Sequence, residues 1–196
     1  MSGTALVVVI ALVLQGIFDA EELGEAAAAG VHWVSLNTGW FFTILTITVF
    51  AFMLIVGYSS KGNIPLGTDD EAPEFSTGSW IAMLFSAGRG IGLLFFGSYE
   101  PLHFFLNTPP GFSATPGSPE AMNAAIGQTL LHWGPFAWSF YALVGGAIAY
   151  SAYRRGRSPL ISAIFTPIFN ERLAMPLGRV IDTFAILVTL FGTAVS

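Results

Sequence analysis

Long apolar runs separated by short polar segments are the dominant pattern of this sequence. Mostly apolar residues fill the ranges 4–18, 37–58, 79–106, 133–153 and 178–196. About 20 apolar residues are enough to cross the hydrocarbon core of a bilayer as an α-helix. Residues 4–18 could also form the core of a signal peptide, but the basic segment that should precede such a core is missing. We therefore predict an all-α membrane protein with about five transmembrane helices, of which the first needs some extension at either end.

The connections between these runs are polar or rich in proline. The first connection is acidic, from Asp19 to Glu25, and is expected to be helical. Four prolines within 107–120 predict a loop outside the membrane, followed by a surface or re-entrant helix over 121–131. Residues 158–169 are apolar but too few to span the bilayer, and they contain two prolines. This last segment fits an interfacial connecting helix.

The basic residues give the orientation of the predicted spans. Alternating spans place nearly all of the 7 basic residues on one side of the membrane. The residues on that side are Lys61, Arg154, Arg155, Arg157, Arg172 and Arg179. Because positively charged loops stay in the cytoplasm, we predict a multi-pass protein of the plasma (inner) membrane with a cytoplasmic N-terminus. The remaining basic residue, Arg89, is left within a span.

Composition supports a membrane protein and excludes several other classes. Hydrophobic residues make up 54% of the chain and charged residues 10%, against about 25% charged residues in soluble domains. The net charge is −5, and no basic patch interleaved with aromatic residues predicts a nucleic-acid partner. The lack of cysteine excludes disulfides and thiolate chemistry, and neither a phosphate-binding loop nor a zinc-protease motif is present. We therefore predict a protein that is not an enzyme and has no catalytic residues.

Glycines alternate with other residues in the middle of the third apolar run, at Gly88, Gly90 and Gly92. Each glycine costs about 1 kcal/mol relative to alanine in a helix, and an unwound turn within a membrane is tolerated only where it is buried in protein or lines a cavity. Such interrupted spans are typical of binding sites in secondary transporters. Gly88 and Gly92 also fit a GxxxG contact between two helices. The glycines alone support the binding site and the helix contact equally. Arg89 favours the binding site, because a buried cation in a membrane is costly.

Aromatic residues gather at the start of the fourth run. On a continuous helix, Trp133, Trp138 and Tyr141 lie within an arc of roughly 140°. Aromatic faces attract cations, and several together can hold a quaternary ammonium group. An aromatic belt at the membrane interface is the alternative, and composition alone favours the belt, at least for Trp133. The deeper positions of Trp138 and Tyr141 support a pocket.

Polar residues of the fifth run have less distinctive patterns. Thr189 and Thr193 lie one helical turn apart and could offer oxygen ligands to a small cation. Membrane threonines more often bond to their own helix backbone, and the threonines taken alone favour that role. Asp182, near the start of the same run, could pair with Arg179 or Arg172.

Other titratable residues lie late in the third run or near the predicted membrane boundaries. Glu100 is followed by a proline and is expected to face a vestibule or to pair across helices. His32, His103 and His132 have aromatic or apolar neighbours and are expected to pack at the interface.

Several of these motifs, in this order, resemble the betaine/choline/carnitine transporter (BCCT) family. Residues 69–76 look like the acidic loop before the family's third helix. Residues 88–92 are similar to the glycine-rich stretch of that helix, and Glu100-Pro101-Leu102 follows at the expected distance. Residues 132–141 resemble the signature of the fourth helix, and 181–193 look like the fifth. The resemblance covers nearly the whole chain.

The resemblance implies a fold and an activity. The activity would be that of a sodium- or proton-coupled symporter, or of an exchanger, for glycine betaine, choline, carnitine or a related compatible solute used in osmoprotection. The fold would be the N-terminal portion of an inverted-repeat (LeuT-like) transporter. Residues 1–77 would hold two peripheral transmembrane helices and the acidic cytoplasmic loop, and 78–196 the first three of ten core helices. Homotrimers are usual in the family.

The resemblance also implies site residues. The aromatic residues would form part of a box around the ammonium group, close to the backbone of the glycine stretch. The substrate-binding positions would be Trp133, Trp138, Tyr141, Gly88, Arg89, Gly90 and Gly92. The ion-binding positions would be Ala87, Arg89, Thr189 and Thr193, with Na⁺ as the coupling ion at the two threonines. No other cofactor is implied.

Two departures from the family pattern affect the expected function. With only three of the ten core helices, the 196 residues are expected to be a fragment or a truncated product that does not transport by itself. Arg89 stands where sodium-coupled members typically have methionine. It could replace a sodium ion, pair with the anionic group of the substrate, or bond to helix carbonyls or Glu100. The alternative from another class is a non-transporting membrane scaffold or assembly subunit, whose aromatic residues face lipid.

Overall fold

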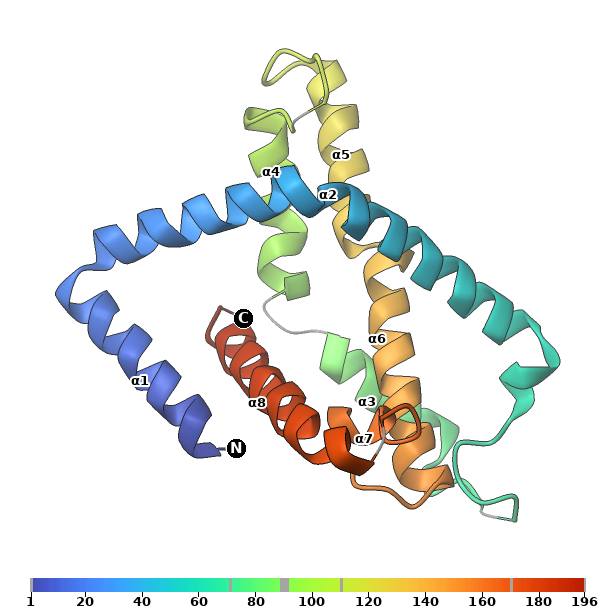
Figure 1. Ribbon diagram of the computed structural model, residues 1–196. Helices are drawn as coiled ribbons and strands as arrows, with labels where there is room; N and C mark the ends of the chain where they lie inside the picture. Colours follow the sequence, from blue (N-terminus) through green and yellow to red (C-terminus); the bar gives the residue numbers. More distant parts are fainter. Residues whose placement is uncertain (1, 71, 89–91, 110, 170, 196) are drawn as a thin grey trace. The chain divides into compact units, whose positions relative to one another are not determined.

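The computed structural model describes residues 2–70, 72–88, 92–109, 111–169 and 171–195 (Figure 1). Within these ranges all regular secondary structure is helical, which confirms the predicted all-α class. Two of the helices described are long and apolar enough to cross a bilayer, at Ala20–Tyr58 and Met175–Thr193. Residues up to 68 and from 143 to 195 form one compact unit, and residues 69–142 form the other. The number of five spans stays a prediction.

The first unit begins with α1 (Ser2–Phe18) and α2 (Ala20–Tyr58), which are joined at Asp19 (Figure 1). The Asp19 carboxylate caps α2 by accepting a hydrogen bond of 3.0 Å from the backbone N–H of Glu22. The acidic connection predicted over 19–25 is therefore this cap followed by the first turns of α2, and its helical character is confirmed. With 39 residues, α2 is about 58 Å long, almost twice the thickness of about 30 Å of a hydrocarbon core. The predicted span 37–58 is its C-terminal part.

A buried polar contact joins α7 (Ile161–Ile164) to α8 (Glu171–Val195) in the first unit. Asp182 is only 5% exposed and accepts hydrogen bonds from the backbone N–H of Ser162 at 3.0 Å and from its hydroxyl at 2.7 Å. Gly178, one turn earlier on α8, lies against the same serine. Asp182 on α8 therefore caps the first turn of α7.

This contact corrects Arg179, one of the two arginine partners that the sequence predicts for Asp182. Asp182 faces α7, whereas the exposed Arg179 lies beside Met175, with 3.7 Å between Nη2 and Sδ. The side chain of Arg172 lies outside the described part of the chain. The connecting helix predicted over 158–169 is also shorter than expected, since only α7 is α-helical there. The prolines of this segment lack the N–H group that a longer helix needs.

Two short helical turns complete the first unit, η1 (Ser60–Asn63) and the π-helical η3 (Tyr150–Arg154). The guanidinium of Arg154 donates a hydrogen bond of 2.8 Å to the backbone carbonyl of Gly67. The guanidinium of Arg155 lies over the ring of Tyr150, 5.4 Å from its centre. Arg154, at the end of the fourth predicted span, thus binds the segment that follows η1, and Arg155 packs against its own helix end.

The second unit contains the third apolar run, 79–106. Its elements are α3 (Thr77–Gly88), the π-helical η2 (Gly92–Phe96), α4 (Gly97–Leu106), α5 (Pro119–Trp133) and the first half of α6 (Pro135–Ala149). In the described residues α3 ends at Gly88, η2 is π-helical and Pro101 lies inside α4. The unwound turn that the glycine pattern predicts falls on Arg89 and Gly90, which lie outside the described residues, and stays a prediction.

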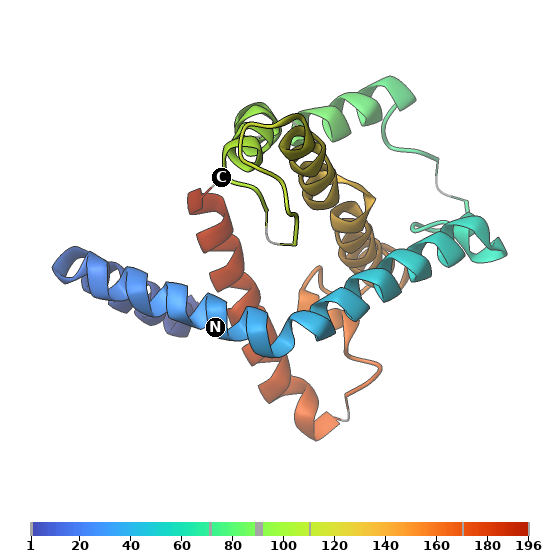
Figure 2. The ribbon, with the colours of Figure 1, turned by 90° about the horizontal axis from the view of Figure 1, so that it is seen from above.

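The helices α4 and α5 lie side by side and run antiparallel (Figures 1 and 2). The buried residues of α5 are the small side chains of Ala121, Ala124 and Ala125, which allow close approach. The connection is the predicted proline-rich loop, closed by a hydrogen bond of 2.9 Å from the N–H of Gly117 to the carbonyl of Phe105. This hairpin positions the residues at the end of α5 against α4.

The start of α5 is capped by Ser118, whose hydroxyl accepts a hydrogen bond of 3.2 Å from the N–H of Ala121. The backbone N–H of Glu120 and the Ser118 hydroxyl hold the pKa of the Glu120 carboxyl below its ordinary value of 4.5. The helix predicted over 121–131 is confirmed, and it is slightly longer than predicted, at 119–133.

Candidate functional site

The carboxylate of Glu100 joins α4 to the end of α5 and forms the centre of the candidate site. Its Oε2 accepts a hydrogen bond from the indole Nε1 of Trp133, and its Oε1 is bonded to Nδ1 of His132. The Glu100 side chain is 15% exposed and is therefore largely buried. Both of its carboxylate oxygens have hydrogen-bond partners in this position. The sequence predicts that Glu100 faces a vestibule or pairs across helices, and the second alternative is the one observed.

The hydrogen bonds of His132 assign its tautomer. Its Nε2 lies 2.8 Å from Nε2 of the Gln128 amide, one turn earlier on α5. An amide nitrogen donates, so the imidazole accepts at Nε2 and carries its proton on Nδ1, from which it donates to Glu100. The chain of bonds thus runs from Gln128 through His132 to Glu100. Simple interfacial packing, as predicted for His132, does not describe this role.

Aromatic rings surround the same helix end. The ring of Phe96 lies nearly parallel to that of Trp133, with 6.4 Å between centres. Phe104 meets the imidazole of His132 edge-on at 5.7 Å. These rings come from η2 and α4, so the packing between the third segment and α5 fixes the surroundings of Trp133 as well as its hydrogen bond.

A break at Gly134 separates α5 from α6. A Cβ atom at Gly134 would lie 2.2 Å from the carbonyl oxygen of Leu130, so this conformation requires glycine. Trp133 therefore ends α5, whereas Trp138 and Tyr141 belong to α6. The single helical arc predicted for these aromatic residues is wrong, because the Gly-Pro pair ends one helix and begins the next.

The structure nevertheless brings these aromatic residues into one neighbourhood. The indole of Trp138 donates a hydrogen bond of 3.1 Å to the backbone carbonyl of Trp133. The rings of Trp138 and Tyr141 lie 5.6 Å apart with a tilt of 46°. In the described chain Trp133, Trp138 and Tyr141 are 40%, 54% and 71% exposed. Aromatic ring faces can attract a cation.

The predicted glycine stretch lies partly outside the described residues. Gly88 is the last residue of α3, and Gly92 is the first of η2. Arg89 and Gly90 lie outside the described residues, as does the side chain of Ala87. The assignment of this stretch to a substrate or ion site stays a prediction.

Thr189 and Thr193 bond to their own helix, as the sequence favours for the threonines taken alone. Their hydroxyls donate to the carbonyl oxygens of Ala185 and Thr189, at 2.8 Å each. Within the described residues, no three acidic, histidine or cysteine side chains lie together where they could hold a metal. Their sodium role stays a prediction.

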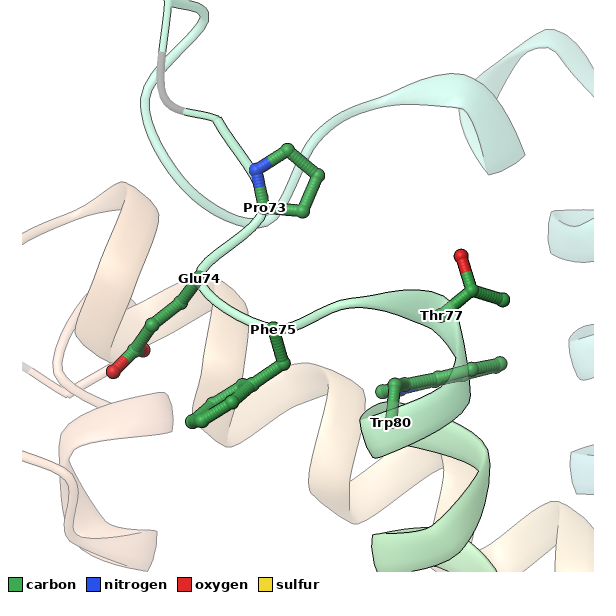
Figure 3. Close-up of a pocket in the computed structure, with 5 residues that line it drawn as sticks. All are labelled: Pro73, Glu74, Phe75, Thr77 and Trp80. Atoms are coloured by element: carbon green, nitrogen blue, oxygen red, sulfur yellow. The ribbon is translucent and has the colours of Figure 1, made fainter.

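An open hollow of about 430 Å³ lies where the acidic loop enters α3 (Figure 3). Its lining residues are Pro73, Glu74, Phe75, Thr77 and Trp80. Figure 3 shows the loop residues leading into the first turn of α3, which carries Thr77 and Trp80. None of the residues predicted to bind substrate or ions lines this hollow. The sequence analysis identifies the acidic loop 69–76 but predicts no hollow there.

Sequence analysis also missed the partners of Glu100. The available signal is physical rather than a motif: a carboxylate within an apolar run is costly unless donors satisfy it. The adjacent His132 and Trp133 offer two such N–H donors at the end of a neighbouring helix. Which helix would supply them depended on the packing of α4 against α5.

Two helices of the described chain are long and apolar enough to cross a bilayer, as an integral membrane protein requires. The family model described as "BCCT, betaine/carnitine/choline family transporter" matches residues 1–196, and the chain belongs to this family. The resemblance given by the sequence motifs is confirmed. The family consists of transporters rather than enzymes, as the sequence predicts.

Relatives with the same family character match almost the whole chain. It is 43% identical over 192 residues to the betaine/ectoine transporter LcoP of Corynebacterium glutamicum, which covers 98% of this chain and 30% of that protein. It is 36% identical to the glycine betaine transporter OpuD of Bacillus subtilis, with 97% of this chain and 37% of that protein covered. A probable glycine betaine transporter of Desulfitobacterium hafniense is 37% identical, with 96% and 38% covered. The chain thus spans about a third of the length of these relatives.

Proposed function

We propose that this chain is part of a secondary active transporter for betaine-type quaternary ammonium or related zwitterionic solutes. The observation that carries the proposal is the aromatic neighbourhood at the break between α5 and α6, where Trp138 pairs with Tyr141 and bonds to Trp133. A quaternary ammonium group has no N–H to donate, so it is bound by aromatic faces rather than by hydrogen-bond acceptors. Family membership and the names of the relatives support the same class of solute.

The architecture that accompanies this function is the inverted-repeat fold, with five spans in this chain. Residues 1–77 would form two peripheral transmembrane helices and the acidic cytoplasmic loop, and residues 78–196 the first three core helices. The N-terminus would be cytoplasmic, in the plasma membrane, and the complete carrier would be a homotrimer. The glycine stretch of the third apolar run supports this proposal, since glycine-interrupted spans are typical of a carrier's binding site.

The aromatic residues give the direct test of the proposed function. We expect Trp138→Ala and Tyr141→Ala each to weaken glycine betaine binding about tenfold, because a desolvated cation–π contact is worth about 1–2 kcal/mol. The measurement is the dissociation constant for glycine betaine of the purified gene product that carries this sequence, from intrinsic fluorescence. Trp80→Ala is the matched control, since this exposed tryptophan of α3 lies outside the aromatic neighbourhood.

The scaffold alternative gives the opposite result in the same experiment. If these rings face lipid, as a non-transporting assembly subunit requires, the wild type shows no glycine betaine binding for Trp138→Ala or Tyr141→Ala to weaken. Binding of choline and carnitine by the same variants would define the range of solutes. Trp138→Phe keeps an aromatic face and is expected to lose less affinity than Trp138→Ala.

Arg89 makes the sodium requirement of this carrier testable. The resemblance places its backbone at a sodium site, and a permanent guanidinium charge there would repel Na⁺. We expect uptake of labelled glycine betaine by the complete gene product to persist when potassium replaces sodium at fixed pH, and Arg89→Met to restore sodium dependence. Uptake that collapses without sodium would contradict this expectation and favour recognition of the substrate's anionic group by Arg89.

A further inference from the structure

Glu100 occupies an unusual position for a carboxylate. It lies in the third apolar segment, directly before Pro101, and its side chain is 15% exposed. A charged group in such a place is retained only where donors satisfy it, and here both oxygens have N–H partners on α5. The cost of placing a carboxylate here indicates a role beyond joining two helices, for which apolar packing would serve as well.

The partners of Glu100 are two neighbouring side chains at the point where α5 ends. One is the indole of Trp133, and the other is the imidazole of His132, which is held in turn by Gln128. An indole attracts a cation through its face and not through its edge. A hydrogen bond from Nε1 to a fixed acceptor restricts rotation of the ring, and the parallel ring of Phe96 covers one side of it.

We propose that Glu100 is a positioning residue of the quaternary ammonium site, an inference that rests on the proposed function. Its carboxylate holds the indole of Trp133 in one orientation and so presents a fixed ring face to the ligand. The negative charge at the indole N–H also adds to the attraction of the ring for a cation. His132 completes the arrangement by holding the carboxylate from the other oxygen.

Two substitutions separate the geometric role from the charge. Glu100→Gln keeps an oxygen that can accept a hydrogen bond from Trp133 but loses the negative charge. Its amide nitrogen would face the N–H of His132, and two donors do not bond to each other. Glu100→Ala removes both bonds. We expect the dissociation constant for glycine betaine to rise about threefold for Glu100→Gln and about tenfold for Glu100→Ala, in line with neutral and charged hydrogen bonds. Glu120→Gln is the matched control, since it removes a carboxylate at the far end of α5.

A spectroscopic signal reports the position of the ring independently of binding. The gene product is labelled with 5-fluorotryptophan, and the ¹⁹F resonance of Trp133 is assigned by its loss in Trp133→Phe. We expect this resonance to shift in Glu100→Ala and to stay in place in Glu120→Gln. A purely structural role of Glu100 would lower the melting temperature while leaving both this resonance and the dissociation constant of the folded protein unchanged.

The outcomes are distinct. A shifted resonance together with weaker binding supports the proposal. An unmoved resonance overturns the positioning role, and a shifted resonance with wild-type affinity overturns its importance for the ligand. Absence of glycine betaine binding in the wild type itself would overturn the proposed function, a result that no Glu100 variant alone can produce.

Discussion

Replacement of Asp182 by alanine is expected to lower the free energy of unfolding by about 2–5 kcal/mol, because each buried donor left unpaired costs about 1–3 kcal/mol. The donors are the backbone N–H and the hydroxyl of Ser162, both of which bond to this carboxylate. The four residues of α7 are too few to form a stable helix by themselves, so its first turn depends on this cap from α8. Thermal unfolding of the gene product in detergent, followed by circular dichroism, measures the effect.

Two further variants make this expectation specific. Asp182→Asn keeps a carbonyl oxygen for the backbone N–H, and its amide can donate to the serine hydroxyl, so we expect a loss of only about 1 kcal/mol. Asp70→Ala removes an exposed carboxylate and is expected to change stability by less than about 0.5 kcal/mol. Equal melting temperatures for Asp182→Ala and Asp70→Ala would show that the contact with Ser162 does not stabilise the protein.

Replacement of Gly134 by alanine is expected to cost about 3 kcal/mol, at the upper end of the range for overpacking. The new Cβ would lie 2.2 Å from the carbonyl oxygen of Leu130, and that backbone atom can move only if the end of α5 moves with it. The same movement displaces Trp133 from Glu100 and from the indole of Trp138. We therefore expect glycine betaine affinity to fall by more than about tenfold in addition to the loss of stability.

Gly127→Ala provides the control for this substitution in the same helix. A Cβ at Gly127 meets no atom within 4 Å, and the residue lies in the exposed face of α5. Alanine should stabilise this position by about 0.5–1 kcal/mol, because glycine is the weaker helix former. A loss of stability for Gly134→Ala together with a gain for Gly127→Ala would establish that the contact with Leu130 requires glycine at position 134. A Gly134→Ala protein as stable as wild type would mean that α5 tolerates a different end.

Local sequence rules predicted several features of the site correctly. Back-bonding of Thr189 and Thr193 depends only on carbonyls four residues earlier in the same helix. The helix predicted over 121–131 likewise depends on its own residues, since Ser118 caps its start. The sequence analysis does not predict the break at Gly134, although the sequence contains a signal for it. That signal is the Gly-Pro pair, which commonly ends a helix. Treating residues 133–141 as one helix gave the wrong arrangement of the aromatic residues.

The partners of buried polar groups could not be predicted from neighbouring residues of the sequence. The nearest arginine in sequence suggested a partner for Asp182, but the carboxylate turned toward Ser162, 20 residues away. Glu100 found its donors on α5, 32 and 33 residues further along the chain. Such pairs depend on which helices pack together and on which faces they present, and consecutive residues do not specify this.

The sequence by itself determined that this is an all-helical membrane protein of the BCCT family, with an aromatic group at the start of its fourth apolar run. These properties follow from apolar content, helix propensity and short motifs, which act over a few neighbouring residues. The tertiary structure alone decided that Glu100 holds Trp133 and that Asp182 caps α7. Each of these contacts satisfies a carboxylate that burial would otherwise leave unpaired, and burial is a property of packed helices rather than of their sequence.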